Sequence, residues 1–187
     1  MTRSSFAVQF VDVAKAYGSF RAVDGISFEV PEQAIFGILG SNGAGKTTSI
    51  RMLMNIILPD EGTIEVLGEA ASEATKARLG YLPEERGLYK KMRVAELLRF
   101  FGRIKGRKDD FLAPRIDYWL DRMGLGAWRD RRVEELSKGM SQKLQFIVTV
   151  VHGPDLLVLD EPFAGLDPVN RDILRDAVLE LHDEGMT

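Results

Sequence analysis

One short segment, 40–48, constrains the fold of this chain more than any other part of its sequence. It reads Gly-Ser-Asn-Gly-Ala-Gly-Lys-Thr-Thr and matches the phosphate-binding pattern G-x-x-x-x-G-K-[ST]. An apolar run bounded by glycine, 34–39, precedes it, and apolar residues at helical spacing follow over 46–55. This order predicts a strand buried on both faces, a glycine-rich loop and a helix, as in α/β proteins with a mostly parallel central sheet.

The glycines of this loop allow the backbone to curl so that successive N–H groups point inward at phosphate oxygens. The helix that begins at Lys46 adds the positive end of its dipole. Lys46 also supplies a mobile cation for the β- and γ-phosphates, and the Thr47 hydroxyl is suited to ligate Mg²⁺. Nucleotide binding is assigned to all residues of the loop: Gly40, Ser41, Asn42, Gly43, Ala44, Gly45, Lys46, Thr47 and Thr48. The alternative, a glycine-rich turn with an accidental lysine, does not account for the flanking strand and helix.

Hydrophobic periodicity divides the rest of the chain into two kinds of segment. Apolar residues at 6–13 and 26–30 indicate strands of an N-terminal antiparallel β part. Further strands are predicted at 63–67, 79–82 and 156–159, and a last amphipathic helix at 170–182. From about 91 to 152 the spacing is helical, which predicts a helical subdomain inserted into the core. We therefore expect a single domain, 1–187, whose core comprises 1–90 and 153–187.

Composition argues against several other classes of function. The 187 residues carry a net charge of −3, so no basic excess indicates nucleic-acid binding, and none is expected. The absence of cysteine excludes a disulfide framework, thiolate metal sites and cysteine catalysis, and it fits a reducing cytoplasm. No apolar run approaches the ~18 residues that a membrane span needs. Any role at a membrane is therefore expected to come through a partner.

Two carboxylates, Asp160 and Glu161, directly follow the apolar run 156–159. In open α/β sheets, ligands bind at the carboxyl ends of the strands. Asp160 suits an outer-shell contact to Mg²⁺. Strand alternation turns Glu161 the other way, toward a water that it can orient or deprotonate for in-line attack. A solvent-facing acidic pair is the alternative for this dipeptide alone, but together with the phosphate loop it predicts a P-loop NTPase that hydrolyses its nucleotide.

The segment Leu-Ser-Lys-Gly-Met, 136–140, is similar to the signature LSGGQ of ATP-binding cassette (ABC) transporters. Through it, and through the motifs on either side, essentially the whole chain resembles the nucleotide-binding domain of that family. Lys138 replaces the first family glycine and Met140 replaces the glutamine, whereas Ser137 and Gly139 are retained. The resemblance implies that these four residues complete the cage around the γ-phosphate of ATP bound to another subunit. Lys138 either adds a phosphate contact or is solvated.

Three further positions carry weaker matches to the same family. Tyr17 resembles the aromatic residue that stacks on adenine, and a surface tyrosine is the alternative. Asp167 resembles the D-loop aspartate that touches the opposite subunit, and an Asp-Pro turn before a helix is the alternative. Glu84, within YLPEERGLY at 81–89, stands where the family has its Q-loop glutamine. Its carboxylate offers an oxygen to Mg²⁺ and is assigned a catalytic role, although it adds negative charge beside the triphosphate.

The resemblance implies an ATPase subunit that powers a membrane transporter, of the exporter type associated with sodium or drug efflux. ATP would be sandwiched between two nucleotide-binding subunits, with Mg²⁺ as cofactor. A transmembrane subunit would hold the protein at the inner, cytoplasmic face of the cell membrane. Two alternatives stay open here: a soluble ABC-type ATPase in translation, DNA repair or cofactor assembly, and a P-loop kinase or GTPase. The latter gives no explanation for 136–140, and the chain lacks the guanine-specifying N-K-x-D motif.

The sequence given ends at Thr187, where the family continues into another strand and a histidine that contacts the γ-phosphate. His152 and His182 do not match that position and are interpreted as ordinary helix-end residues. From the sequence we therefore expect a domain that lacks its C-terminal part, and that binds nucleotide but turns it over weakly or not at all.

Overall fold

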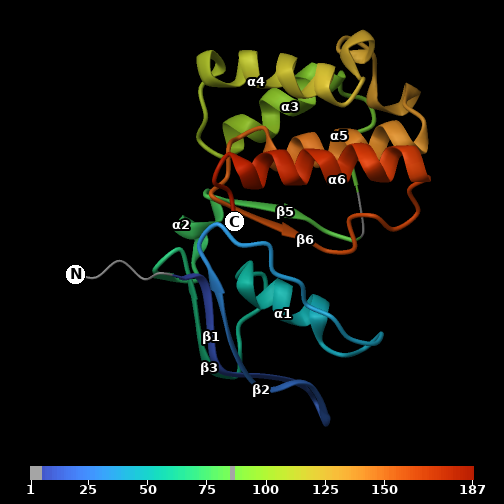
Figure 1. Ribbon diagram of the computed structural model, residues 1–187. Coiled ribbons are helices and arrows are strands. Elements are labelled where there is room, and N and C mark those ends of the chain that lie inside the picture. The colour runs from blue at the N-terminus through green and yellow to red at the C-terminus, as the bar shows by residue number, and fades with distance from the viewer. Residues whose placement is uncertain (1–5, 85–86) are drawn as a thin grey trace. The chain divides into compact units, whose positions relative to one another are not determined.

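The computed structural model describes residues 6–84 and 87–187 (Figure 1). This described part divides into two compact units, one formed by 6–79 with His182–Thr187 and the other by Gly80–Leu181. The phosphate loop and the N-terminal strands belong to the first unit. The signature segment and the acidic strand belong to the second.

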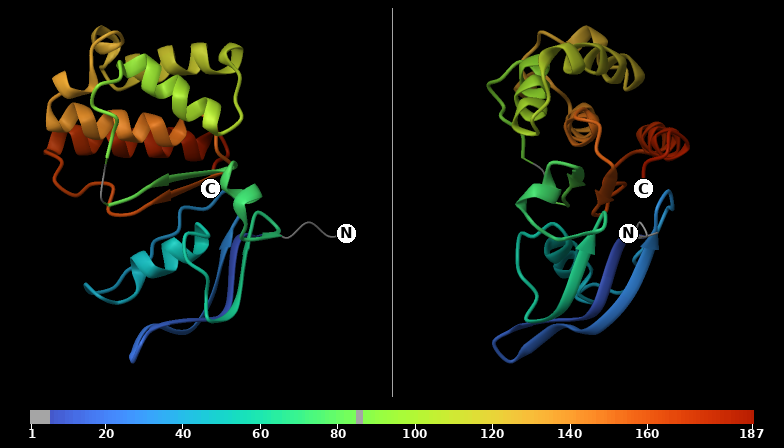
Figure 2. Two further views of the ribbon diagram at one scale, coloured as in Figure 1. Left: turned by 180° about the vertical axis from the view of Figure 1, so that it is seen from behind. Right: turned by 90° about the vertical axis from the view of Figure 1, so that its left-hand side faces the viewer.

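The first unit is built on an antiparallel sheet with the strand order β2-β1-β3-β4. Its elements are β1 Phe6–Tyr17, β2 Phe20–Pro31, α1 Lys46–Leu53, β3 Glu61–Val66, β4 Glu69–Ala70 and α2 Glu73–Lys76. Helix α1 contacts β2 and β3 and lies along the sheet (Figure 2). Its Met52 and Leu53 side chains are buried, as is Phe10 of β1. Apolar burial therefore holds the helix that follows the phosphate loop against the sheet.

The β1–β2 hairpin is longer than its apolar pattern predicts. Pairing runs from Phe6 opposite Pro31 to Tyr17 opposite Phe20. The apolar alternation ends near Val13, but backbone hydrogen bonding continues to the turn because each strand supplies the other's partners. The predicted antiparallel part is therefore confirmed, and Tyr17 ends its first strand.

The second unit combines a pair of strands with a set of helices. Its elements are β5 Leu79–Leu82, α3 Val94–Ile104, α4 Asp109–Arg122, α5 Lys138–Val150, β6 Leu156–Leu159 and α6 Pro168–Asp183, with 3₁₀ turns at Gly126–Trp128 and Val133–Glu135. Strands β5 and β6 are neighbours and run in the same direction (Figure 1). Trp119 of α4 packs edge-to-face on Phe146 of α5, with ring centroids 5.8 Å apart. The α/β class is thus confirmed, while the subdomain boundaries near 91 and 152 stay a prediction.

Two arginines bind the carboxyl end of α5. Arg107 donates from Nε to the His152 carbonyl at 2.7 Å, and Arg115 donates from Nε to the Val151 carbonyl at 3.0 Å. Both guanidinium groups lie over the Phe111 ring, 4.9 and 5.4 Å from its centroid. Cations at this end satisfy helix carbonyls and oppose the helix dipole. The signature helix is thereby tied to α4 and to the turn before it.

The strand predicted at 34–39 is wrong in this structure. Residues 34–40 form no regular element, and Ile35 and Leu39 are 62% and 94% exposed. An apolar run becomes a strand only where neighbouring strands pair with its backbone, and no described strand pairs with this one. Phe36 does make an apolar contact within its unit, since its ring stacks on Phe28 at 5.5 Å. Among the helices of the described residues, none has the length and apolar character needed to cross a membrane.

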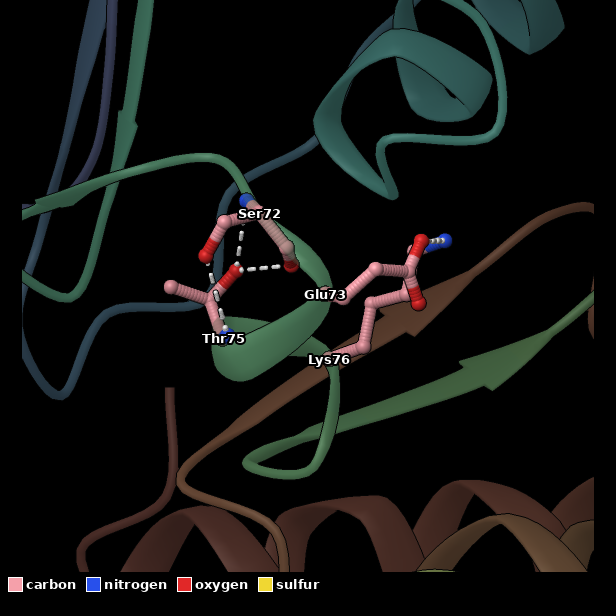
Figure 3. A network of polar contacts seen from close by, with 4 residues as sticks. All are labelled: Ser72, Glu73, Thr75 and Lys76. Atoms are coloured by element: carbon pink, nitrogen blue, oxygen red, sulfur yellow. Dashed lines mark hydrogen bonds and ion pairs between the residues drawn. The ribbon is translucent and has the colours of Figure 1, made fainter.

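Helix α2 is stabilised by reciprocal hydrogen bonds between Ser72 and Thr75 (Figure 3). The Ser72 amide donates to Thr75 Oγ1 at 3.1 Å, the Thr75 amide donates to Ser72 Oγ at 3.4 Å, and the Thr75 hydroxyl donates to the Ser72 carbonyl at 2.8 Å. Thr75 is 1% exposed, so water does not replace these partners. Glu73 and Lys76 form an ion pair on the solvent side of the same turn.

Replacing Thr75 by valine should lower the free energy of unfolding by roughly 1–3 kcal/mol, because the half-buried Ser72 amide loses the Thr75 hydroxyl as acceptor and the Ser72 carbonyl loses it as donor. Urea denaturation measures this change. Glu73→Gln, which alters an exposed ion pair on the same turn, should change stability by less than about 1 kcal/mol. Equal effects of the two substitutions would contradict the role given to the Thr75 hydroxyl.

Candidate functional site: a phosphate loop and an acidic strand

The phosphate loop ends in a helix whose first amide groups have no side-chain acceptor. Helix α1 begins at Lys46, and Gly45 before it makes no side-chain capping hydrogen bond. The first turn also contains no acidic residue. The free N–H groups and the positive end of the helix dipole are therefore available to an anion. Residues 41–44 are exposed to solvent, whereas Gly45, Lys46, Thr47 and Thr48 are half-buried.

The ammonium group of Lys46 folds back over the loop that precedes it. Its Nζ donates to the Gly40 carbonyl at 2.8 Å and to the Ser41 carbonyl at 2.9 Å. A mobile cation is thus held at the centre of a loop of exposed backbone. Phosphate oxygens are stronger acceptors than neutral carbonyls for such a cation. The ammonium group therefore lies on the loop itself, and phosphate binding by the loop and Lys46 stays a prediction.

Gly45 brings the loop into contact with the sheet. It has a φ of 85°, and a Cβ atom at this position would lie 2.4 Å from the Ala22 carbonyl oxygen of β2. Only glycine fits so close to another backbone without displacing it. The start of α1 is therefore fixed against β2, near the end of the β1–β2 hairpin. Tyr17, whose side chain is about half exposed, ends the first strand of that hairpin.

Asp160 is buried at the end of the acidic strand. It is 4% exposed, and its amide donates to the Leu82 carbonyl of β5 at 2.9 Å. Its Oδ2 atom is buried without a hydrogen-bond partner in the part of the chain that is described. A buried carboxylate oxygen is costly unless something pairs with it. The site therefore suits a cation at this atom.

Glu161 is exposed, but for a different reason than predicted. Strand β6 ends at Leu159, and Glu161 has a φ of 47°, in the left-handed region. Strand alternation therefore does not orient its side chain; a sharp turn does, in which the Ala164 amide donates to the Glu161 carbonyl at 3.1 Å. Asp160 is buried and Glu161 is exposed, so the two residues do differ in their surroundings, while their roles toward Mg²⁺ and water stay predictions. The left-handed backbone costs a non-glycine residue about 1–2 kcal/mol.

The signature segment forms the N-terminus of α5. Ser137 caps this helix, and its Oγ accepts from the Met140 amide at 3.3 Å. Lys138 extends toward the turn after the acidic strand, because a Cβ atom on Gly165 would be 3.7 Å from its Nζ. The same turn receives a hydrogen bond from Gln142, whose Nε2 donates to the Ala164 carbonyl at 3.3 Å. The start of α5 and the turn before α6 are thus brought together.

Asp167 caps α6. Its Oδ1 accepts from the Asn170 amide at 3.0 Å, and its Oδ2 accepts from the Asn170 side chain. These two hydrogen bonds hold the pKa of Asp167 below its usual range, and the bond from the Asn170 amide contributes more than the bond from its side chain. The Asp-Pro turn weighed from the sequence is present, with Pro168 as the first residue of the helix. Contact with another subunit stays a prediction.

Three residues near the predicted positions were missed by sequence reasoning. Asn170 lies between Asp167 and the signature, since a Cβ atom on Gly139 would be 3.0 Å from its Nδ2. Its spacing of three residues after an aspartate that precedes a helix is a capping signal that could have identified it. Gln142 and Asp60 carry no such signal.

Glu84 is exposed beyond β5, and Glu85 and Arg86 of the same motif lie outside the described residues.

The fold, the phosphate loop and the acidic strand define a nucleotide-binding protein of the P-loop class. A model of the ABC transporter family matches residues 23–164. A solved structure of an ATP-binding subunit of an ABC transporter matches with a TM-score of 0.88 and 26% identity, covering 96% of this chain and 76% of that chain. The chain therefore belongs to the ABC transporter family.

Two curated relatives match over nearly the whole chain. The ABC transporter ATP-binding protein YhaQ of Bacillus subtilis is 46% identical over 175 residues, which cover 94% of this chain and 59% of YhaQ. The daunorubicin/doxorubicin resistance ATP-binding protein DrrA of Streptomyces peucetius is 36% identical over 189 residues, which cover 100% of this chain and 57% of DrrA. The chain thus spans less than two thirds of the length of these relatives, and one of them is named for drug resistance.

Gly45→Ala should weaken binding of ATP at least tenfold, because the new Cβ atom would meet the Ala22 carbonyl and displace the start of α1. Equilibrium binding of a fluorescent ATP analogue measures the loss. Gly43→Ala is the matched control, since a Cβ atom there meets nothing within 4 Å although its φ is also positive. A smaller loss at Gly45 than at Gly43 would contradict the contact with β2.

Glu161→Gly should be more stable than Glu161→Ala by about 1 kcal/mol, because glycine adopts the left-handed backbone without cost. Thermal or urea denaturation of the two variants gives the difference. The same pair of substitutions at Asp172, inside α6, should show the opposite order by about 1 kcal/mol. The same sign at both positions would disprove backbone strain at Glu161.

Proposed function

We propose that this protein binds and hydrolyses ATP and that it powers a membrane transporter as its ATP-binding subunit. The observation that carries the proposal is the phosphate loop, in which the Lys46 ammonium lies on two loop carbonyls and the start of α1 has no side-chain cap. Family membership supports ATP over other nucleotides. YhaQ, which is named as an ABC transporter ATP-binding protein, favours transport over the soluble alternative. The export type is proposed because DrrA is named for drug resistance.

In the proposed complex, the amides of 40–48 surround the β- and γ-phosphates and Lys46 moves from the loop carbonyls to the phosphate oxygens. Tyr17 stacks on the adenine ring. Thr47 in the first turn of α1 and the unpartnered Oδ2 of Asp160 are hard oxygen ligands, which fit Mg²⁺ directly or through water. The bound ion supplies positive charge that neutralises the phosphate oxygens. Glu84 is the proposed further oxygen ligand.

Hydrolysis needs a water placed in line with the γ-phosphate and a group that accepts its proton. Glu161 is the proposed base, because its carboxylate is exposed at the end of β6 beside the buried Asp160. The water's oxygen forms a bond to phosphorus as the bond to the β-phosphate oxygen breaks, giving ADP and inorganic phosphate. The remaining catalysis is positioning and charge stabilisation by the loop.

In this proposal, the signature at the start of α5 does not contact the ATP bound by its own subunit. Ser137, Lys138, Gly139 and Met140 act on ATP held by a second subunit, and Asp167 contacts that subunit. The exposed helix start capped by Ser137 supports this role, because helix N-termini bind anions. A transmembrane subunit completes the assembly and places the protein at the cytoplasmic face of the membrane. Relatives named as ABC transporter ATP-binding proteins support that partner.

Lys46→Ala should weaken ATP binding at least tenfold, whereas Glu161→Gln should retain binding and reduce hydrolysis by about a hundredfold or more. Calorimetry measures the binding and phosphate release measures the hydrolysis, on the full chain with Mg²⁺. Lys91→Ala, which removes an exposed lysine far from the loop in sequence, is the control for charge. Preference for GTP, or transfer of phosphate to a small acceptor, would overturn the proposal.

A further inference from the structure

Asp60 joins the loop before β3 to the end of β1 through three hydrogen bonds. Its amide donates to the Ala14 carbonyl at 2.9 Å, and its Oδ2 accepts from the Ala16 amide at 2.8 Å. Its Oδ1 accepts from the Lys15 ammonium at 2.7 Å. Backbone pairing between β1 and β3 stops at Ala14 opposite Glu61. Beyond this point the Asp60 carboxylate, rather than a backbone carbonyl, accepts the hydrogen bond of the Ala16 amide. The end of β1 is therefore bonded to β2 on one side and to Asp60 on the other.

The residue that follows these contacts is Tyr17. The Lys15 ammonium, held by Asp60, lies 5.9 Å from the centroid of the Tyr17 ring, within range of a cation–π contact. Strand alternation does not decide this contact, because the pairing of β1 with β2 is irregular between Lys15 and Ala16, but the distance places the two side chains side by side. Asp60 therefore restrains both the peptide before Tyr17 and the cation beside its ring.

The same hairpin contacts the phosphate loop. Tyr17 pairs with Phe20, and the Ala22 carbonyl of the same strand lies against Gly45. Two residues of strand separate Phe20 from Ala22, which is about 7 Å along the sheet. An aromatic ring anchored here is at a fixed offset from the start of α1. A group that sets the hairpin end thus sets where a base can stack relative to the phosphates.

We propose that Asp60 is a positioning residue for adenine, which acts by holding Ala16 and Lys15 so that Tyr17 presents its ring to the base. This inference rests on the proposed function, in which Tyr17 stacks on the adenine of bound ATP. Asp60 itself touches no nucleotide. The Lys15 ammonium and then the Ala16 amide hold the pKa of Asp60 below its usual range, so the carboxylate is charged at neutral pH.

The test compares two ligands that share phosphates but differ in the base: ATP and inorganic tripolyphosphate, each with Mg²⁺. Calorimetry on the full chain measures both affinities for the wild type and for Asp60→Ala, Asp60→Asn and Tyr17→Ala. Asp60→Ala should weaken ATP about tenfold, as loss of a stacked aromatic does, and leave tripolyphosphate unchanged. Asp60→Asn should lose less, because its amide oxygen still accepts from Ala16.

Two further comparisons decide the result. Combining Asp60→Ala with Tyr17→Ala should weaken ATP no more than Tyr17→Ala alone, because both act through one ring. Glu61→Gln, which alters the adjacent exposed carboxylate paired with Arg21, should leave both ligands unchanged. An equal loss of ATP and tripolyphosphate in Asp60→Ala, or no loss of either, would overturn the inference.

Different results are expected if the proposed function itself is wrong. If Tyr17→Ala keeps the wild-type preference for ATP over tripolyphosphate, the inference falls together with the assignment of Tyr17, while the phosphate loop stands. If the wild type binds neither ligand, or if Lys46→Ala binds both as the wild type does, the phosphate loop itself is wrongly assigned and the inference falls with it. Retained tripolyphosphate binding also shows that Asp60→Ala is folded.

Discussion

The close approach of Gly45 to the Ala22 carbonyl is the constraint on which the first unit depends. A Cβ atom at Gly45 would lie 2.4 Å from that oxygen, so the loop can reach the sheet only with glycine there. Apolar burial of Met52 and Leu53 then keeps α1 in place behind the loop. Because β2 also forms the β1–β2 hairpin, one sheet carries both the phosphate loop and the proposed adenine platform. The two parts of the proposed nucleotide site thus rest on the same sheet.

The second unit is organised around α5 in a comparable way. Its N-terminus is capped by Ser137 and stays exposed, while its carboxyl end is closed by Arg107 and Arg115. A helix fixed at one end and open at the other presents its positive end to solvent without fraying at the far end. Asn170 and Gln142 connect that open end to the turn after Glu161. Movement of the signature is therefore expected to be coupled to movement of the acidic turn.

The sequence predicted most elements and motifs, because these depend on local pattern. Helix α1 begins at Lys46 as the loop motif requires, and the acidic pair follows β6. The prediction of a strand at 34–39 was wrong because a strand needs neighbouring strands to pair with, and the apolar pattern of one segment does not show whether they are present. The turn at Glu161 was missed because hydrophobic periodicity does not indicate that a glutamate has a positive φ. Asp60 lies far from Ala16 in sequence, and only the fold brings an ordinary surface carboxylate to the hairpin end.

In the proposed binding mode, the phosphates of ATP lie on the amides that begin α1 and the base lies against the β1–β2 hairpin. The most direct test is an NMR titration of the ¹⁵N-labelled chain with ATP and Mg²⁺, followed at each backbone amide. ATP should cause the largest shift changes at 43–48 and a second group at 15–18, and tripolyphosphate should cause only the first group. Changes confined to other segments, or identical changes with both ligands, would contradict it.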